Sequence, residues 1–197
     1  VEANDTVAVS AQSTKSFTCD ASLIYPIEAL GVDYRIVSHL GDPSGPNANY
    51  RSAFAIVATE NSTTIEITPS VLTKGGNAAN TKFTIVLNKG ESYQVQASTN
   101  KLDLTGTLVQ ALNCKRIAVF GGSSRSAIGP PGNSCASSYD HLYEQMMPIN
   151  LWGKRFILAP TVWAKGKLRK WELIKVVANT NNTIVRFNNR PVKIINA

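Results

Sequence analysis

The sequence of 197 residues has only two histidines and three cysteines, almost no helical periodicity, and no run of 18 apolar residues. Without such a run, no segment is long enough to cross a bilayer as an apolar helix, and no membrane insertion is expected. The opening residues, VEANDTVAVS, lack the basic and apolar regions of a signal peptide. A mature or excised secreted protein would lack them too.

Metal-binding and catalytic motifs are also missing. No two cysteines form a CxxC pair, and neither His39 nor His141 lies in an HExxH motif, so zinc is not expected. DPSGPN (42–47) lacks the spacing of an EF-hand. The segment GGSSRS (121–126) is not a GxSxG elbow and has no Walker lysine, so it is predicted to be a glycine turn after a strand. The sequence predicts no enzyme, no cofactor and no metal.

Basic residues concentrate in the last quarter of the chain. From position 151 to 197 there are ten lysines and arginines and one acid, whereas the net charge of the whole chain is +7. The simpler interpretation of this basic segment is a solvent-exposed surface of the protein, and the alternative is a binding site for an anionic partner. Within 162–177, aromatic and cationic residues alternate in a way that can hold a sulfated or sialylated glycan rather than nucleic acid. The candidate glycan-binding residues are Trp163, Lys165, Lys167, Arg169, Lys170 and Trp171.

The rest of the chain carries strand and turn signals. Runs rich in Val, Ile, Thr, Phe and Tyr alternate with Gly, Pro, Asn and Asp clusters. In TTIEIT, Ile65 and Ile67 share one face and Glu66 lies on the other, as in a half-buried strand. ENST (60–63) and NKG (88–90) are predicted hairpin connections. The fold class is therefore all-β, an antiparallel β-sandwich. Predicted strands cover 6–10, 34–40, 52–60, 63–69, 82–88, 91–97 and 116–122.

A weak internal repeat is present, and its matches keep the same order in both copies. It places Pro26 on Pro148 and Gly31 on Gly153, and after one deletion it places Thr64 on Thr183. The matched segments are YPIEALGVDYRIV (25–37) with MPINLWGKRFILA (147–159), FAIVATENSTTIEI (54–67) with IKVVANTNNTIVRF (174–187), and FTIVLNKGE (83–91) with PVKIINA (191–197).

This repeat predicts a first β module over 1–138, with a leading strand segment over 1–20, and the truncated start of a second, related module over 139–197. The second copy has no counterparts of ESYQVQA, LTGTLVQ and RIAVFGG, so its sheet edges and apolar faces would be exposed. We expect either that the chain is a fragment of a longer protein or that another polypeptide supplies the missing strands. Alternatively, the copies are the two halves of one pseudo-symmetric domain.

Five blocks carry a family resemblance over roughly residues 34–197. They are FAIVATENSTTIEITPS, FTIVLNKGESYQVQ, DLTGTLV, RIAVFGG and DHLYEQMMPINLWGKRFILAP, in that order. Together they resemble the N-terminal domain of the IgG-Fc-binding protein family. The resemblance implies a secreted mucus, matrix or adhesion protein without known enzymatic activity. Antibody-Fc binding, which gives the family its name, is not implied for every member.

The cysteines depart from the family pattern. The family commonly has one cysteine after the VFGG glycines and another directly before the DHL aspartate, where this chain has SSRSA and Tyr139. A bridge between Cys114 and Cys135 would replace the family's link. The alternatives are a bridge between Cys19 and Cys135, or an intermolecular bridge.

The segment DHLYEQ (140–145) brings together Asp140, His141 and Glu144, and it therefore raises the question of a metal site, a triad around His141 or a glycosidase pair. We interpret it instead as a structural joint that leads into Pro148 and Gly153, with Asp140 as the N-cap of a short helical turn. The first copy enters its own joint through CDASLIYP, with no His or Glu. His141 and Glu144 are therefore expected to bond polar groups across the interface between the copies.

Three sequons, at Asn4, Asn61 and Asn181, are candidate glycosylation sites and favour a secreted, extracellular protein. The leading functional prediction is a structural or adhesive module that associates with other protein chains or with glycans. The alternative is an anionic-glycan-binding domain that uses the 162–177 hairpin, and a hydrolase at DHLYEQ is the remote third.

Overall fold

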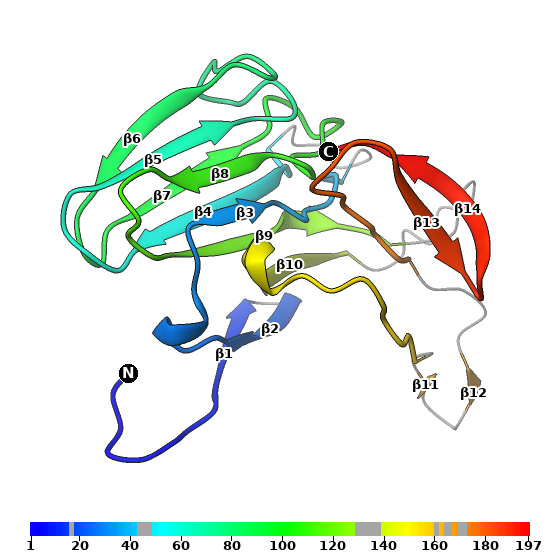
Figure 1. The fold of residues 1–197 in the computed structure, drawn as a ribbon, viewed down its shortest axis with the longest axis horizontal. Coiled ribbons are helices and arrows are strands. Elements are labelled where there is room, and N and C mark those ends of the chain that lie inside the picture. The colour runs from blue at the N-terminus through cyan, green and yellow to red at the C-terminus, as the bar shows by residue number, and fades with distance from the viewer. Residues whose placement is uncertain (16–17, 43–48, 129–138, 160–161, 164–166, 169–172) are drawn as a thin grey trace.

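The computed structural model describes the chain except residues 16–17, 43–48, 129–138, 160–161, 164–166 and 169–172. Its described regular structure is β-strand apart from two short 3-10 turns, η1 Ile27–Ala29 and η2 Ile149–Leu151 (Figure 1). The strands are β1 Val9–Lys15, β2 Thr18–Ile24, β3 Asp33–Arg35, β4 Ser52–Ala58, β5 Thr63–Thr68, β6 Phe83–Leu87, β7 Ser92–Gln96, β8 Leu108–Ala111, β9 Ile117–Ser126, β10 Asp140–Gln145, β11 Val162–Trp163, β12 Lys167–Leu168, β13 Thr183–Phe187 and β14 Arg190–Ile195.

Two four-stranded antiparallel sheets form a sandwich (Figure 1). The β9 sheet has the order β10-β9-β4-β7, and the β8 sheet has the order β3-β8-β5-β6. Every neighbouring pair in both sheets runs antiparallel. The predicted all-β, antiparallel sandwich-like fold is therefore confirmed. Among the described residues, no helix has the length and apolar character needed to cross a membrane.

The core lies between the two sheets and follows the alternation of the strands. In β5, Ile65 and Ile67 are fully buried, while Glu66 lies on the opposite face and pairs with Lys82 at 2.7 Å. Full burial of an isoleucine of this kind contributes about 1.5–3 kcal/mol. The core cluster consists of Tyr34, Ile36, Phe54, Ile56, Ala58, Ile65, Ile67, Leu87, Val95, Ala97, Leu104, Val109, Ala111, Ile117, Val119 and Met146.

The two predicted hairpin turns join strands of different sheets instead. Residues 60–63 lead from β4 into β5, and residues 88–90 lead from β6 to β7, so each link crosses between the sheets. The hairpin prediction was wrong because turn residues with positive φ, such as Ser62 and Gly90, reverse the chain without specifying which sheet the next strand joins. A true hairpin forms between β5 and β6.

The glycines of GGSSRS lie inside β9, so the prediction of a turn at 121–126 was also wrong. β9 continues to Ser126 and pairs with both β4 and β10. A Cβ on Gly122 would lie 1.8 Å from the carbonyl oxygen of Leu142, and a Cβ on Gly121 would lie 2.3 Å from that of Val37. These glycines therefore allow a close approach of neighbouring backbone within a strand.

Residues 140–145 form a strand, not the helical turn that Asp140 was expected to cap. β10 is the edge strand of the β9 sheet and pairs with β9. The next residue, Met146, belongs to the core cluster and donates its N–H to the Val119 carbonyl at 2.7 Å. The segment that follows, residues 147–197, is called the second segment below. The predicted module boundary at residue 138 stays a prediction.

Candidate functional site

The outer edge of β10 is covered by side chains of β2, which bond to its backbone, rather than by backbone pairing with a further strand. Three backbone N–H groups of β10 donate to side-chain oxygens of β2, and each donor lies 123 residues after its acceptor, so β2 runs parallel to β10. An uncovered edge would offer its N–H groups to another chain. The pairs are His141 N–H with Thr18 Oγ1 at 3.0 Å, Tyr143 N–H with Asp20 Oδ2 at 2.7 Å, and Gln145 N–H with Ser22 Oγ at 2.9 Å.

β2 pairs antiparallel with β1 in a hairpin, and Asp140 and His141 are bonded to β2 of this hairpin. The Asp140 carboxylate accepts a hydrogen bond from the Thr18 hydroxyl and another from the Cys19 N–H at 3.0 Å. The His141 Nδ1 lies 2.7 Å from Thr18 Oγ1. Glu144 is exposed and has no hydrogen-bond partner in the described part of the chain. Partial burial raises the pKa of the Glu144 carboxyl, and the charge of Asp20 raises it further. The role of these residues as a joint stays a prediction.

The two Pro-Ile turns that the repeat pairs have the same local structure. Pro26 and Pro148 have φ, ψ values of −63°, 156° and −65°, 151°, and each precedes a single 3-10 turn. The N–H of Leu30 donates to Ile27 O at 3.1 Å, and the N–H of Trp152 donates to Ile149 O at the same distance. The second turn packs on the first, since a Cβ on Gly31 would lie 2.5 Å from the Pro148 Cβ.

The turns before β5 and β13 also match, bond for bond. The residue at the left-handed position is Ser62 (φ 53°) in one turn and Asn182 (φ 60°) in the other. Thr63 lies opposite Leu87 and Thr183 opposite Ile195, so the correspondence is Thr63 with Thr183 and needs no deletion. In the first matching pair, Lys89 N–H donates to Asn61 Oδ1 and Ala197 N–H donates to Asn181 Oδ1, both at 3.0 Å. In the second, Ser62 N–H donates to Asn88 Oδ1 at 3.1 Å and Asn182 N–H to Asn196 Oδ1 at 2.9 Å. In the third, Thr63 Oγ1 donates to Glu60 O at 2.7 Å and Thr183 Oγ1 to Thr180 O at 2.8 Å.

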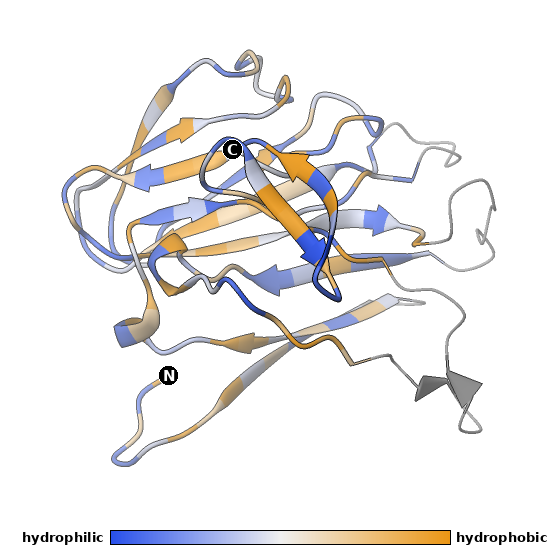
Figure 2. Cartoon of the chain, turned by 45° about the vertical axis from the view of Figure 1, so that its right-hand side comes forward, coloured by the Kyte–Doolittle hydropathy of each residue, from blue (hydrophilic) through white to orange (hydrophobic). Residues whose placement is uncertain are grey.

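The second segment leaves large apolar side chains uncovered. The β13–β14 hairpin lies beside the sandwich in Figure 1, and Figure 2 shows apolar residues along it. In the described part of the chain, β13 and β14 pair only with each other. Among the described residues of this segment, the exposed large apolar ones are Met147, Leu151, Phe156, Ile157, Leu158, Leu173, Ile174, Val176, Ile184, Phe187, Val192 and Ile194.

One ion pair ties the second segment to the sandwich. The Lys175 Nζ lies 2.6 Å from Asp103 Oδ2 and also donates to the Ser38 carbonyl. Burial alone would raise the pKa of Asp103, but hydrogen bonds from Lys175 and Thr105 outweigh it, so the pKa lies below its ordinary value of 3.8. Burial also lowers the pKa of the neighbouring His39, and the Lys175 charge lowers it further. Lys175, part of the predicted basic hairpin, is therefore engaged with the sandwich.

Replacing Asp103 with Asn is expected to weaken this attachment by about 1.5–3 kcal/mol at pH 7, the contribution of a hydrogen bond to a charged group. Because the folded pKa is depressed, the unfolded chain takes up the proton first as the pH falls. The difference in free energy of unfolding between wild type and Asp103→Asn should therefore reach its maximum above about pH 5 and decrease below pH 3.8. Urea unfolding measured across this pH range checks it. The control is the same substitution in a Lys175→Met background, which lacks the cation of the pair and should show no such pH-dependent loss.

The remaining predicted site residues are placed only in part. Cys19 and Cys114 are exposed and not bonded to each other, and Cys135 lies outside the described residues, so the disulfide stays a prediction. Asn4, Asn61 and Asn181 are all exposed. β11 and β12 pair with Trp163 opposite Lys167, whereas Lys165, Arg169, Lys170 and Trp171 lie outside the described residues. Gly153 is exposed and Pro148 is buried.

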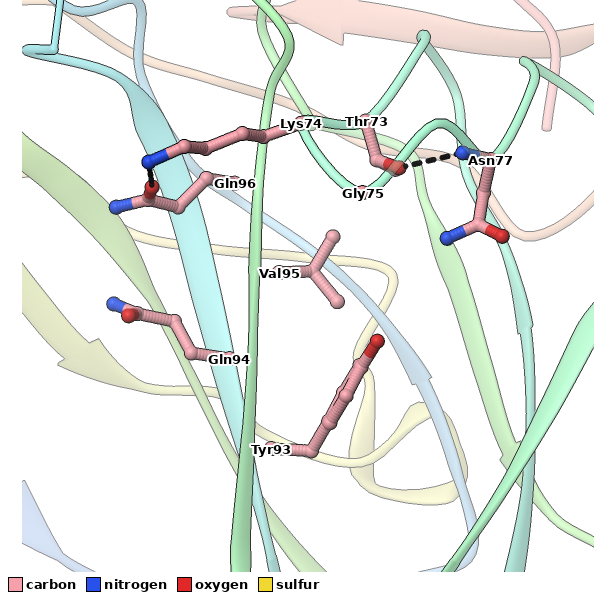
Figure 3. A pocket seen from close by; sticks show the side chains of 8 residues that line it. All are labelled: Thr73, Lys74, Gly75, Asn77, Tyr93, Gln94, Val95 and Gln96. Atoms are coloured by element: carbon pink, nitrogen blue, oxygen red, sulfur yellow. Dashed lines mark hydrogen bonds between the residues drawn. The ribbon is translucent and has the colours of Figure 1, made fainter.

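Two surface hollows flank the β9 sheet. A shallow one of about 240 Å³ lies at its β7 edge, where Lys74 reaches Gln96 and the Asn77 N–H donates to the Thr73 hydroxyl (Figure 3). A larger groove, of about 520 Å³, lies between β1 and the outer face of the sheet. Within the described ranges, no three or more His, Cys, Asp or Glu side chains cluster in a way that could hold a metal ion.

The fold and these surfaces define an antiparallel β-sandwich domain with a separate two-stranded sheet, β13–β14, that carries exposed apolar residues. The model of the IgGFc-binding protein family matches residues 20–197, so the chain belongs to that family. A curated relative, the human IgGFc-binding protein, is 27% identical over 180 residues, covering 88% of this chain and 3% of the human protein. The chain thus spans a small fraction of that relative's length. No solved structure matches the chain.

Proposed function

We propose that this chain is an extracellular association module, a non-enzymatic part of a secreted matrix, mucus or adhesive protein that binds other polypeptides. Family membership supports a binding role. Binding of IgG Fc is named for the human relative alone. A hydrolase at residues 140–145 is not proposed, because Asp140 and His141 are engaged with Thr18 and Cys19 of β2.

The main support for this proposal is that residues buried in the sandwich correspond to exposed residues in the second segment. We take the second segment as a partial second copy of the sandwich, on the matching turns and strand register described above. Four large side chains that are fully buried in the sandwich have counterparts in the second segment that are more than half exposed. The pairs are Tyr34 (0%) with Phe156 (75%), Ile36 (0%) with Leu158 (54%), Ile56 (0%) with Val176 (54%) and Ile67 (0%) with Phe187 (56%).

The first copy indicates what would cover this face. There, β4 lies between β7 and β9, and β5 pairs with β8. The described residues of the second segment include no strand that corresponds to β7, β8 or β9. We infer that strands equivalent to these, from a unit of the same family, complete the second copy by strand addition.

Because the uncovered face is apolar, the isolated chain should self-associate through it, in a concentration-dependent manner measurable by sedimentation velocity. Phe187→Thr removes an inward-position side chain of β13 and should weaken association at least about tenfold, since burying a phenylalanine contributes about 1.5–3 kcal/mol. Ile194→Thr is the matched control. Ile194 lies opposite Ile184 on the same hairpin and corresponds to Val86, which is exposed in the complete sandwich as well.

The control variant should associate like the wild type. A chain that stays monomeric over the whole concentration range would contradict the proposal. So would equal association of the wild type and Phe187→Thr. Circular dichroism of both variants establishes that the sandwich itself stays folded.

A further inference from the structure

We propose that the groove between β1 and the outer face of the β9 sheet is a binding site for a neutral carbohydrate. The groove has a volume of about 520 Å³, within the range of pockets that hold small ligands. It is separate from the apolar face of the second segment, and no residue after Tyr143 lines it.

The floor of the groove is hollow because the middle of the sheet carries small residues. Ala53 of β4 lies opposite Gly122 of β9, and Ala55 lies opposite Phe120. Since residues directly opposite each other in a pair share a face, these small side chains and Phe120 lie on the same outer surface. Larger residues at Ala53 or Ala55 would fill the groove.

An aromatic platform stands beside this floor. The rings of Phe120 and Tyr143 are nearly parallel, at an angle of 4°, with their centroids 5.2 Å apart. Both side chains are only partly buried and both line the groove. Each ring of the stacked pair keeps one face free of the other ring. A free aromatic face suits the apolar face of a sugar ring, on which the C–H groups carry partial positive charge and meet the electron-rich ring face.

The rim supplies hydrogen-bonding groups without charge. Gln94 of β7 lies opposite Ala55, and Gln12 and Ser13 of β1 line the other side. Amide and hydroxyl groups both donate and accept, as the hydroxyls of a sugar require. His141 also lines the groove.

The charge of the lining selects the class of carbohydrate. Among the described residues that line the groove there is no Asp, Glu, Lys or Arg. A sulfated or sialylated glycan would lose its hydration there without gaining a cation. The groove therefore favours a neutral sugar, in contrast to the anionic glycan that the basic 162–177 hairpin would take.

The test is an NMR titration of the ¹⁵N-labelled chain with chitotetraose, with N-acetyllactosamine and with a heparin tetrasaccharide. At least one neutral sugar should give saturable shifts of the Gly122 and Ser124 amides, with little change at Gly75. Saturable binding of the heparin tetrasaccharide alone in the groove, or no saturable shift there with either neutral sugar, would overturn the proposal.

Two variants localise the binding. Phe120→Ala removes half of the platform, and Ala55→Leu fills the floor without removing any core side chain; each should weaken binding at least tenfold. Gln96→Ala is the matched control, because Gln96 lies on the same face of β7 as Gln94 but lines the other hollow. Unchanged binding in folded Ala55→Leu would overturn the proposal. Binding that persists in Phe187→Thr would separate this site from the association surface.

Discussion

Replacing Gly122 with Ala is expected to destabilise the sandwich by at least about 3 kcal/mol, at the upper end of the range for overpacked sites. A Cβ at this position would lie 1.8 Å from the Leu142 carbonyl oxygen and 2.7 Å from its carbonyl carbon. Both are backbone atoms of the paired strand β10, so no side-chain rotation relieves the clash. For a domain of this size the loss corresponds to a fall in Tm of about 6–12 °C, measurable by differential scanning calorimetry.

Gly75→Ala is the matched control for this prediction. The nearest atom to a Cβ on Gly75 is the Asn77 Nδ2 at 3.6 Å, an ordinary van der Waals distance. An alanine in a loop with compatible backbone angles is neutral or stabilises by about 0.4–1 kcal/mol through the unfolded state. Equal Tm values for Gly122→Ala and Gly75→Ala would show that β9 and β10 separate at no cost, contrary to the packing described above.

The strands that the sequence predicted well are those whose apolar side chains face the core. In β5, Ile65 and Ile67 alternate with Glu66, and this alternation shows which face is buried, because the strand orients so that its apolar side chains face the core. The internal repeat was visible for the same kind of reason. Asn61 and Asn181 make corresponding side-chain bonds that close their turns, so the residue type is tied to the local geometry.

The strand predictions missed β10, which has no alternation of buried and exposed residues, and β2, whose pattern is reversed. In β2 the polar residues Thr18 and Ser22 face the protein, while Cys19 and Leu23 are exposed. Hydrophobic periodicity assumes that the inward face is apolar, and here the inward face instead supplies oxygen atoms to backbone N–H groups of β10. The sequence did contain one indication of β2, namely a polar residue at every second position without helical periodicity.

Likewise, the groove on the β9 sheet could not be seen in the sequence. Its floor depends on the opposition of Ala53 with Gly122 and of Ala55 with Phe120 across two strands, and its platform depends on the stacking of Phe120 with Tyr143 of β10. The residues of a pair lie up to 69 positions apart in the sequence, as Ala53 and Gly122 do. The register of a sheet fixes them, and no local motif records that register.

Removing the three inward-facing polar side chains of β2 should open the β10 edge, because each supplies the acceptor for one β10 amide. In the variant Thr18→Val, Asp20→Ala, Ser22→Ala, the N–H groups of His141, Tyr143 and Gln145 lose these acceptors, although His141 keeps a second one, Asp140 Oδ1 at 2.9 Å. An unsatisfied donor costs about 1–3 kcal/mol, so local opening should become easier by about 3 kcal/mol or more. Hydrogen exchange of the Tyr143 and Gln145 amides should accelerate by at least about a hundredfold.

The Met146 amide is an internal reference for this experiment, since it donates to Val119 of β9 at 2.7 Å rather than to β2. Its exchange should change little if only the hairpin is released. Leu23→Ser, on the exposed face of β2, is the control variant and should leave all four amides protected. If the triple variant also keeps them protected, backbone contacts alone hold the hairpin in place. If Met146 exchanges as fast as the other three, β2 supports the whole sandwich and not just its edge.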